Sequence, residues 1–107
     1  MTVRVPFRRI DVAEARTLMA RPDLLLLDMR EAKAHASASI VSSRHVTEAN
    51  IHEFISRTPR TRPVLIYCHH GNASQVYAQT FADFGFSEVY SLDGGFEAWR
   101  EAEKAIS

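Results

Sequence analysis

Residues 64–74 read VLIYCHHGNAS: an apolar run leads to a cysteine, a short polar loop and the start of a helical pattern. The apolar residues Val64 to Tyr67 follow Pro63 and include two β-branched side chains. They predict a short strand that is buried on both faces, as in a parallel sheet. Cys68 therefore stands at the carboxyl end of this strand.

A helix is predicted to begin at Ser74, directly after the loop. The residues that recur at helical spacing are Val76, Tyr77, Thr80, Phe81 and Phe84. Gly85 follows where a C-terminal cap is expected. Because the first amides of a helix have no partner within the helix, the loop and the helix start can cradle an anion beyond the carboxyl end of the strand.

Cys68 is a candidate nucleophile, since free N–H groups and the helix dipole favour a thiolate over a thiol. The alternative is that Cys68 is merely a small apolar side chain, because free cysteine is among the most buried residue types. The glycine-containing loop and the following helix favour the reactive interpretation.

Length and composition predict one soluble domain spanning residues 1–107, with 46% hydrophobic and 24% charged residues. Thirteen basic and thirteen acidic residues leave no net charge, which argues against binding nucleic acid or a membrane surface through bulk electrostatics. No apolar run approaches the length of a membrane span, and residues 1–9 lack the apolar core of a signal peptide. We therefore expect a cytoplasmic protein.

The single cysteine excludes an internal disulfide, a multi-cysteine zinc site and a CxxC redox motif. Cys68, His69 and His70 are adjacent, but neighbours in a loop rarely converge on one metal ion, so neither a metal nor a cofactor is expected. If Cys68 acquires a group, no second cysteine in the chain can release it. Turnover then requires an external acceptor.

Five histidines invite two further interpretations. A Cys-His dyad would need an imidazole from elsewhere in the fold, for which His35, His45 and His52 are candidates by elimination only. His69 and His70, inside the loop, can add positive charge and contact a bound anion when they are protonated.

The N-terminal part of the chain predicts an edge strand at Val3 and Val5 before Pro6. A helix follows, with Asp11 as N-cap and Glu14 at capping-box spacing. Its inner stripe is Val12, Ala15, Leu18 and Met19.

A second apolar run, residues 24–27, predicts a central parallel strand that ends in Asp28-Met29-Arg30. Asp28 stands three residues before Glu31, so we expect it to cap a short helix around residues 31–36. A functional alternative pairs Asp28 with Arg30 at the carboxyl edge of the sheet, where they would brace the Cys68 loop.

The remaining elements are expected in this order: a short strand at residues 44–46, a helix starting at Thr47 or Asn50, a strand at 88–92, a turn at 93–95 and a closing helix at 96–102. Their inward residues are Ile51, Phe54, Ile55, Phe96 and Trp99. The glycines of Asp93-Gly94-Gly95 suit unusual backbone angles. Alternating strand and helix signals predict a parallel α/β sheet.

Four features together resemble the rhodanese, or thiosulfate sulfurtransferase, family: Asp28-x-Arg30, the strand ending in Cys68, the loop CHHGNAS and the closing VYSLDGGFEAW. The likeness runs from about Ile10 to Trp99 and is greatest to short single-domain bacterial enzymes associated with glycerol metabolism. It implies a three-layer α/β/α fold with a five-stranded parallel sheet.

The resemblance also implies a reaction. Cys68 would take the outer sulfur of thiosulfate, release sulfite and carry a persulfide, which cyanide, a small dithiol or reduced thioredoxin would then remove. The sulfur pocket would be formed by His69, His70, Gly71, Asn72 and Ala73 through their backbone amides. Loop support would come from Asp28, Arg30 and Ser74.

Two departures from the family pattern matter for the substrate. Phosphatase and arsenate reductase relatives have a longer loop that ends in arginine, whereas this loop contains no arginine to clamp a phosphate. Many sulfurtransferase members carry Arg or Lys near Ala73, and this chain has only His69 and His70 there. The family's usual Gly-His before the third strand is replaced by Ala38-Ser39, which concerns the scaffold. We therefore expect a sulfurtransferase using thiosulfate or a persulfide donor, with a non-catalytic rhodanese-type binding or regulatory module as the alternative.

Overall fold

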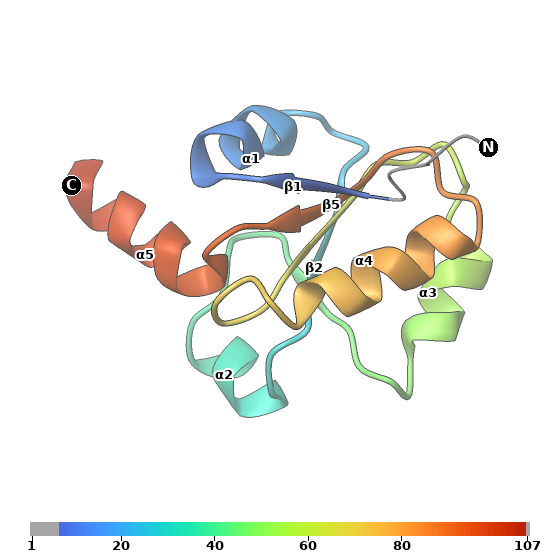
Figure 1. Ribbon diagram of the computed structural model, residues 1–107. Helices are drawn as coiled ribbons and strands as arrows, with labels where there is room; N and C mark the ends of the chain where they lie inside the picture. Colours follow the sequence, from blue (N-terminus) through green and yellow to red (C-terminus); the bar gives the residue numbers. More distant parts are fainter. Residues whose placement is uncertain (1–6, 107) are drawn as a thin grey trace.

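The computed structural model describes residues 7–106, so the predicted strand at Val3 and Val5 lies outside the described residues. Ten elements alternate along the chain (Figure 1): β1 (Arg8–Ile10), α1 (Val12–Met19), β2 (Leu25–Asp28), α2 (Ala32–Ser37), β3 (Arg44–His45), α3 (Ile51–Arg57), β4 (Val64–Tyr67), α4 (Ser74–Asp83), β5 (Val89–Leu92) and α5 (Gly95–Ile106). Within the described residues, no helix has both the length and the apolar composition needed to cross a membrane.

The five strands form one sheet in the order β1-β5-β4-β2-β3, and all neighbouring strands are parallel. This arrangement confirms the predicted fold. β4 is the central strand, with Leu65 paired in register with Leu26 on one side and Tyr90 on the other. The loop that follows β4 therefore leaves the middle of the sheet's carboxyl edge.

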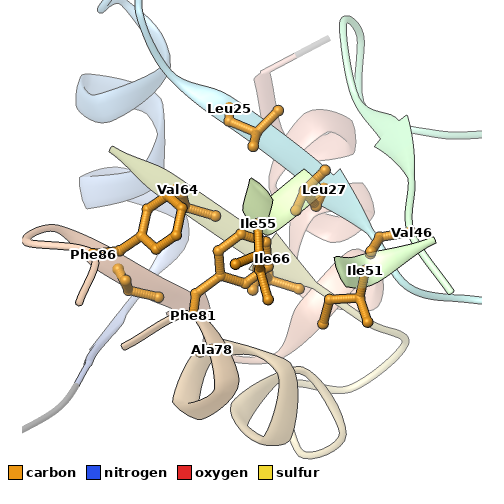
Figure 2. Close-up of a cluster of buried hydrophobic side chains, with 11 residues drawn as sticks. Leu25, Leu27, Val46, Ile51, Ile55, Val64, Ile66, Ala78, Phe81 and Phe86 are labelled. Atoms are coloured by element: carbon orange, nitrogen blue, oxygen red, sulfur yellow. The ribbon is translucent and has the colours of Figure 1, made fainter. Parts of the chain in front are cut away.

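The sheet has a core on each face, because successive strand residues point to opposite sides. Leu25, Leu27, Val64 and Ile66 pack with residues of α3 and α4, as Figure 2 shows. Leu26, Leu65 and Tyr67 pack on the other face with residues of α1 and α5. Helices thus cover both faces, which is visible in Figure 1 as α1 and α5 on one side of the strands and α3 and α4 on the other.

Several local predictions are confirmed. Asp11 and Glu14 form the complete capping box of α1, with Ala15 and Leu18 buried beneath it. The short strand predicted at residues 44–46 is present as β3 over Arg44–His45, and α3 has Asn50 as its N-cap. Ile51 and Ile55 are buried, and Phe54 packs partly buried against the same core.

The helix after the loop begins at Ser74 as predicted, and only some of the residues that recur at helical spacing face the core. Ala78 and Phe81 are fully buried, whereas Val76 is 66% exposed and Phe84 48% exposed. Ser74 is itself buried and lies on the same helix face as Ala78 and Phe81, four and seven residues further along the chain.

The closing helix is longer than predicted and begins one residue earlier, at Gly95. Gly94 and Gly95 have φ angles of +76° and +59°, the left-handed conformations expected for this turn. Phe96 and Trp99 are buried as predicted.

Candidate active site

Cys68 follows β4 directly and is 95% buried, with a relative exposure of 5%. Its Sγ accepts hydrogen bonds from the backbone N–H groups of Gly71 and Ser74, both at 3.2 Å. The Ser74 amide is the first of α4, so the loop turns back and directs a helix N-terminus at the sulfur. This arrangement favours negative charge at the position of Sγ.

The loop is fixed from behind by the start of α5. The amides of Phe96 and Glu97 donate to the carbonyl oxygens of Cys68 and His69, at 2.8 and 3.1 Å. Gly71 adopts a φ of +94°, and a Cβ there would lie 2.7 Å from the Gly94 nitrogen. Only glycine fits this contact, which keeps the loop amides facing the sulfur.

Two buried serines extend the contacts of the sulfur into the sheet. The Cys68 thiol lies 3.3 Å from Ser74 Oγ, which in turn lies 2.7 Å from Ser91 Oγ of β5. Both serines are fully buried. Sequence reasoning identified Ser74 but missed Ser91, whose signal is a serine within an otherwise apolar strand.

Asp28 pairs with Arg30 and does not cap a helix, so the capping prediction is wrong. α2 has Glu31 at its N-cap position and no side-chain cap hydrogen bond. Instead the Arg30 guanidinium donates to Asp28 Oδ2 at 2.7 Å, and the Arg30 amide donates to Oδ1 at 2.9 Å. The physical reason is burial: a carboxylate removed from water must be paired and hydrogen bonded, and this requirement outweighs a local cap.

A network of further donors surrounds the Asp28 carboxylate. The Tyr67 hydroxyl donates to Oδ2 at 2.9 Å, and His35 Nδ1 lies 2.9 Å from the same atom. Burial alone would raise the pKa of Asp28, but the hydrogen bonds from Arg30, His35 and Tyr67 outweigh it and the pKa is lowered. Asp28 is therefore held as a carboxylate below the loop.

A cavity of about 230 Å³ opens beside the sulfur. Its lining residues are Met29, Arg30, Glu31, Cys68, His69, His70, Asn72 and Ala73. The structure thus brings Cys68, Arg30 and four of the five predicted loop residues to one cavity, while Gly71 is not part of the lining. It adds Met29 and Glu31, which sequence reasoning did not single out. Because the Arg30 guanidinium is bound to Asp28 and the Ala38 carbonyl, its charge is already neutralised at this edge of the cavity.

His69 has a carboxylate partner across the mouth of the cavity. Its Nε2 lies 2.8 Å from Glu31 Oε2, and both side chains are partly exposed. The hydrogen bond from His69 lowers the pKa of Glu31. The positive charge expected from His69 is therefore paired, whereas His70 lines the cavity and is exposed.

The three histidines considered for a Cys-His dyad lie in other contacts. His45 Nε2 is 2.6 Å from the Arg30 carbonyl oxygen and its ring stacks on His35, while His52 packs edge-on against Phe84. Among residues 7–106, no imidazole hydrogen bonds to Sγ, and no three His, Cys, Asp or Glu side chains form a metal-binding group. The dyad hypothesis is wrong because the partners of Sγ are amides and a hydroxyl.

The sulfur of Cys68 accepts hydrogen bonds from loop and helix amides at the carboxyl edge of a parallel α/β sheet. This arrangement is typical of proteins in which a cysteine thiolate reacts with anionic groups. Comparison with known proteins makes this class specific. The Rhodanese-like domain family matches residues 11–102, and the chain belongs to that family.

Curated relatives can be aligned with most of this chain. The thiosulfate sulfurtransferase GlpE of Ectopseudomonas mendocina is 42% identical over 94 residues, covering 88% of this chain and 85% of that protein. The protein of the same name from Tolumonas auensis is 36% identical, covering 88% of this chain and 89% of its own.

Solved structures share the fold. A rhodanese-related protein from Thermoplasma volcanium superimposes with a TM-score of 0.76 at 24% identity, over 90% of this chain and 93% of that one. The human single-domain sulfurtransferase TSTD1 gives a TM-score of 0.75 at 16% identity, over 92% and 97% of the two chains.

Proposed function

We propose that this protein is a thiosulfate sulfurtransferase in which Cys68 carries the transferred sulfur. The observation that carries the proposal is the position of Sγ, which accepts two backbone N–H bonds at 3.2 Å inside a small cavity. These donors stabilise a sulfur anion, the form that attacks a sulfur donor. The names of the curated relatives supply the reaction class and its donor.

The reaction has two balanced steps. The Cys68 thiolate attacks the outer sulfur of thiosulfate, the S–S bond of thiosulfate breaks, and sulfite leaves with the bonding electron pair. Cys68 then holds a persulfide. Cyanide removes the outer sulfur as thiocyanate, or a dithiol removes it by forming its own disulfide and releasing hydrogen sulfide; either acceptor restores the Cys68 thiolate.

Charges around the cavity bear on the choice of donor and acceptor. Asp28 neutralises Arg30, and Glu31 pairs with His69, so binding of a small anion depends on the amides of residues 69–73 and on His70. We propose thiosulfate or a persulfide as donor, and cyanide, a dithiol or reduced thioredoxin as acceptor. The cytoplasm, where small thiols stay reduced, is the proposed location.

Weighing the intact protein after incubation with thiosulfate tests the proposal. Wild type is expected to gain the mass of one sulfur atom and to lose it when cyanide is added. Cys68→Ser is the matched control and is expected to gain nothing, because its hydroxyl cannot form a persulfide. No adduct on wild type, or an equal adduct on Cys68→Ser, would contradict the proposal.

Thiol reactivity separates this function from a non-catalytic binding module. For a sulfur carrier, the rate of alkylation of Cys68 is expected to be high already at neutral pH. An ordinary thiol, with a pKa of about 8.5, reacts slowly until the pH reaches about 8. A rate that stays low up to that pH, with a protein partner retained by Cys68→Ala, would favour the binding module.

The loop histidines give a second test of donor binding. Replacing His69 and His70 together by alanine is expected to raise the KM for thiosulfate more than it changes kcat, because positive charge beside the anion is removed. Glu31→Gln is the complementary change and is expected to lower KM by releasing His69 from its carboxylate. Steady-state kinetics measure both, and an unchanged KM in both variants would assign donor binding to the amides alone.

A further inference from the structure

Ser91 is a hydroxyl buried within the central region of the sheet. It lies on β5 opposite Ile66 of β4 and is fully buried, although serine is a residue type found mostly at the surface. Its Oγ is 2.7 Å from Ser74 Oγ, and Ser74 Oγ is 3.3 Å from Cys68 Sγ. The Cys68 loop, the start of α4 and strand β5 therefore contribute one continuous line of polar atoms ending at the sulfur.

The protonation state of Cys68 determines which group donates and which accepts in each hydrogen bond of this line. When Cys68 is a thiol, its S–H donates to Ser74 Oγ, and the Ser74 hydroxyl is free to donate to Ser91. When Cys68 is a thiolate, Sγ can only accept, so the hydrogen of Ser74 must turn toward the sulfur. The Ser74 oxygen then has an open acceptor position, which the hydroxyl of Ser91 fills at 2.7 Å without any movement of heavy atoms.

We propose that Ser91 is a positioning residue for sulfur transfer, which acts through Ser74 by holding the Ser74 hydrogen on the sulfur whenever Cys68 is a thiolate. The thiolate is the form of Cys68 that attacks the donor, and release of sulfur to the acceptor regenerates it. Consecutive hydroxyls that donate in one direction polarise each other, so the second hydroxyl strengthens the bond made by the first. This inference rests on Cys68 being the sulfur carrier, as proposed above.

The thiolate can be observed directly, without any sulfur donor, by its ultraviolet absorbance as a function of pH. Because Cys68 is the single cysteine of the chain, the difference between each variant and its Cys68→Ser counterpart isolates its signal. At neutral pH, Ser91→Ala is expected to lower the ratio of thiolate to thiol by up to about twofold, because the Ser74–Ser91 hydrogen bond exists in both protonation states and only its polarisation of the bond to the sulfur is specific to the thiolate. Ser91→Thr keeps the hydroxyl and is expected to restore the ratio.

A double-mutant cycle tests the route through Ser74. If Ser91 acts through Ser74, Ser91→Ala is expected to have no further effect once Ser74 is alanine. Thr58→Val, which removes another buried hydroxyl at the end of α3, is the matched control and is expected to leave the titration unchanged.

Two results would overturn the inference. One is a Ser91→Ala titration that coincides with wild type, and the other is an equal Ser91→Ala effect in the presence and absence of the Ser74 hydroxyl. A general disturbance of the fold is distinguished by a change in the thiolate absorbance reached at high pH, which a loss of hydroxyl orientation does not affect. Because no donor is used, the result stands whether or not thiosulfate is a substrate.

Discussion

Gly95→Ala is expected to lower the rate of sulfur transfer strongly and to destabilise the protein. A Cβ at this position would lie 2.4 Å from the Cys68 carbonyl oxygen and 2.6 Å from the His69 carbonyl carbon, both backbone atoms that cannot move aside independently. The φ of +59° adds the strain of a left-handed conformation. We expect a loss of roughly 3 kcal/mol or more in the free energy of unfolding, and about 100-fold in kcat/KM as the loop amides are displaced from Sγ.

Gly85→Ala is the matched control for backbone strain. Gly85 has a φ of +92°, but a Cβ placed there has no atom within 4 Å. We expect it to cost about 1 kcal/mol through backbone conformation alone and to leave kcat/KM unchanged. Chemical denaturation and steady-state kinetics measure both variants. Equal effects of the two substitutions would show that contact with the loop is not what Gly95 provides.

Arg30→Met is expected to lower the free energy of unfolding by about 3–5 kcal/mol at neutral pH, because it leaves a buried carboxylate without its guanidinium. The side chains of Arg30 and Asp28 are 4% and 0% exposed, and their N–O distance is 2.7 Å. The pKa of Asp28 is lowered in the folded protein, so the pair contributes fully above the unfolded carboxyl pKa of about 3.9 and less as the pH falls below it. The difference between Arg30→Met and wild type is therefore expected to narrow below about pH 4.

Two further variants make the Arg30 result specific. Asp28→Asn combined with Arg30→Met removes the unpaired charge and is expected to recover part of the lost stability. Arg57→Met breaks an exposed pair with Glu53 at 3.1 Å and is expected to cost less than about 1 kcal/mol. Urea unfolding at neutral and acidic pH measures all three. A pH-independent loss in Arg30→Met would contradict the electrostatic explanation.

Most of the fold could be predicted from local signals. The apolar runs that became β2 and β4 are too short for helices and are flanked by turn residues, and the box at Asp11 and Glu14 marks a helix start within four residues. Such patterns depend on neighbours in the chain. The same reasoning failed at Asp28, where a cap spacing was present but a buried charge required the guanidinium of Arg30.

The site could be predicted only where its residues are adjacent in the chain. The loop residues from Cys68 to Ser74 are contiguous, so their grouping could be inferred from the turn and the helix that follows. Contacts between segments that are distant in the chain could not be inferred from the sequence. Glu31 reaches His69 across 38 positions and Ser91 reaches Ser74 across 17, and both pairs depend on the order in which the strands assemble.

Cys68 accepts hydrogen bonds from two helices through different atoms. Its sulfur receives the first amide of α4, whereas its backbone carbonyl receives an amide from the first turn of α5. The carbonyl contact is made by the backbone, so replacing Cys68 by a residue of similar size, such as serine, leaves the contact with α5 in place. A duplicated copy of this gene could therefore lose the thiol by a single substitution and retain the folded surface, ready to be selected for recognition in place of chemistry.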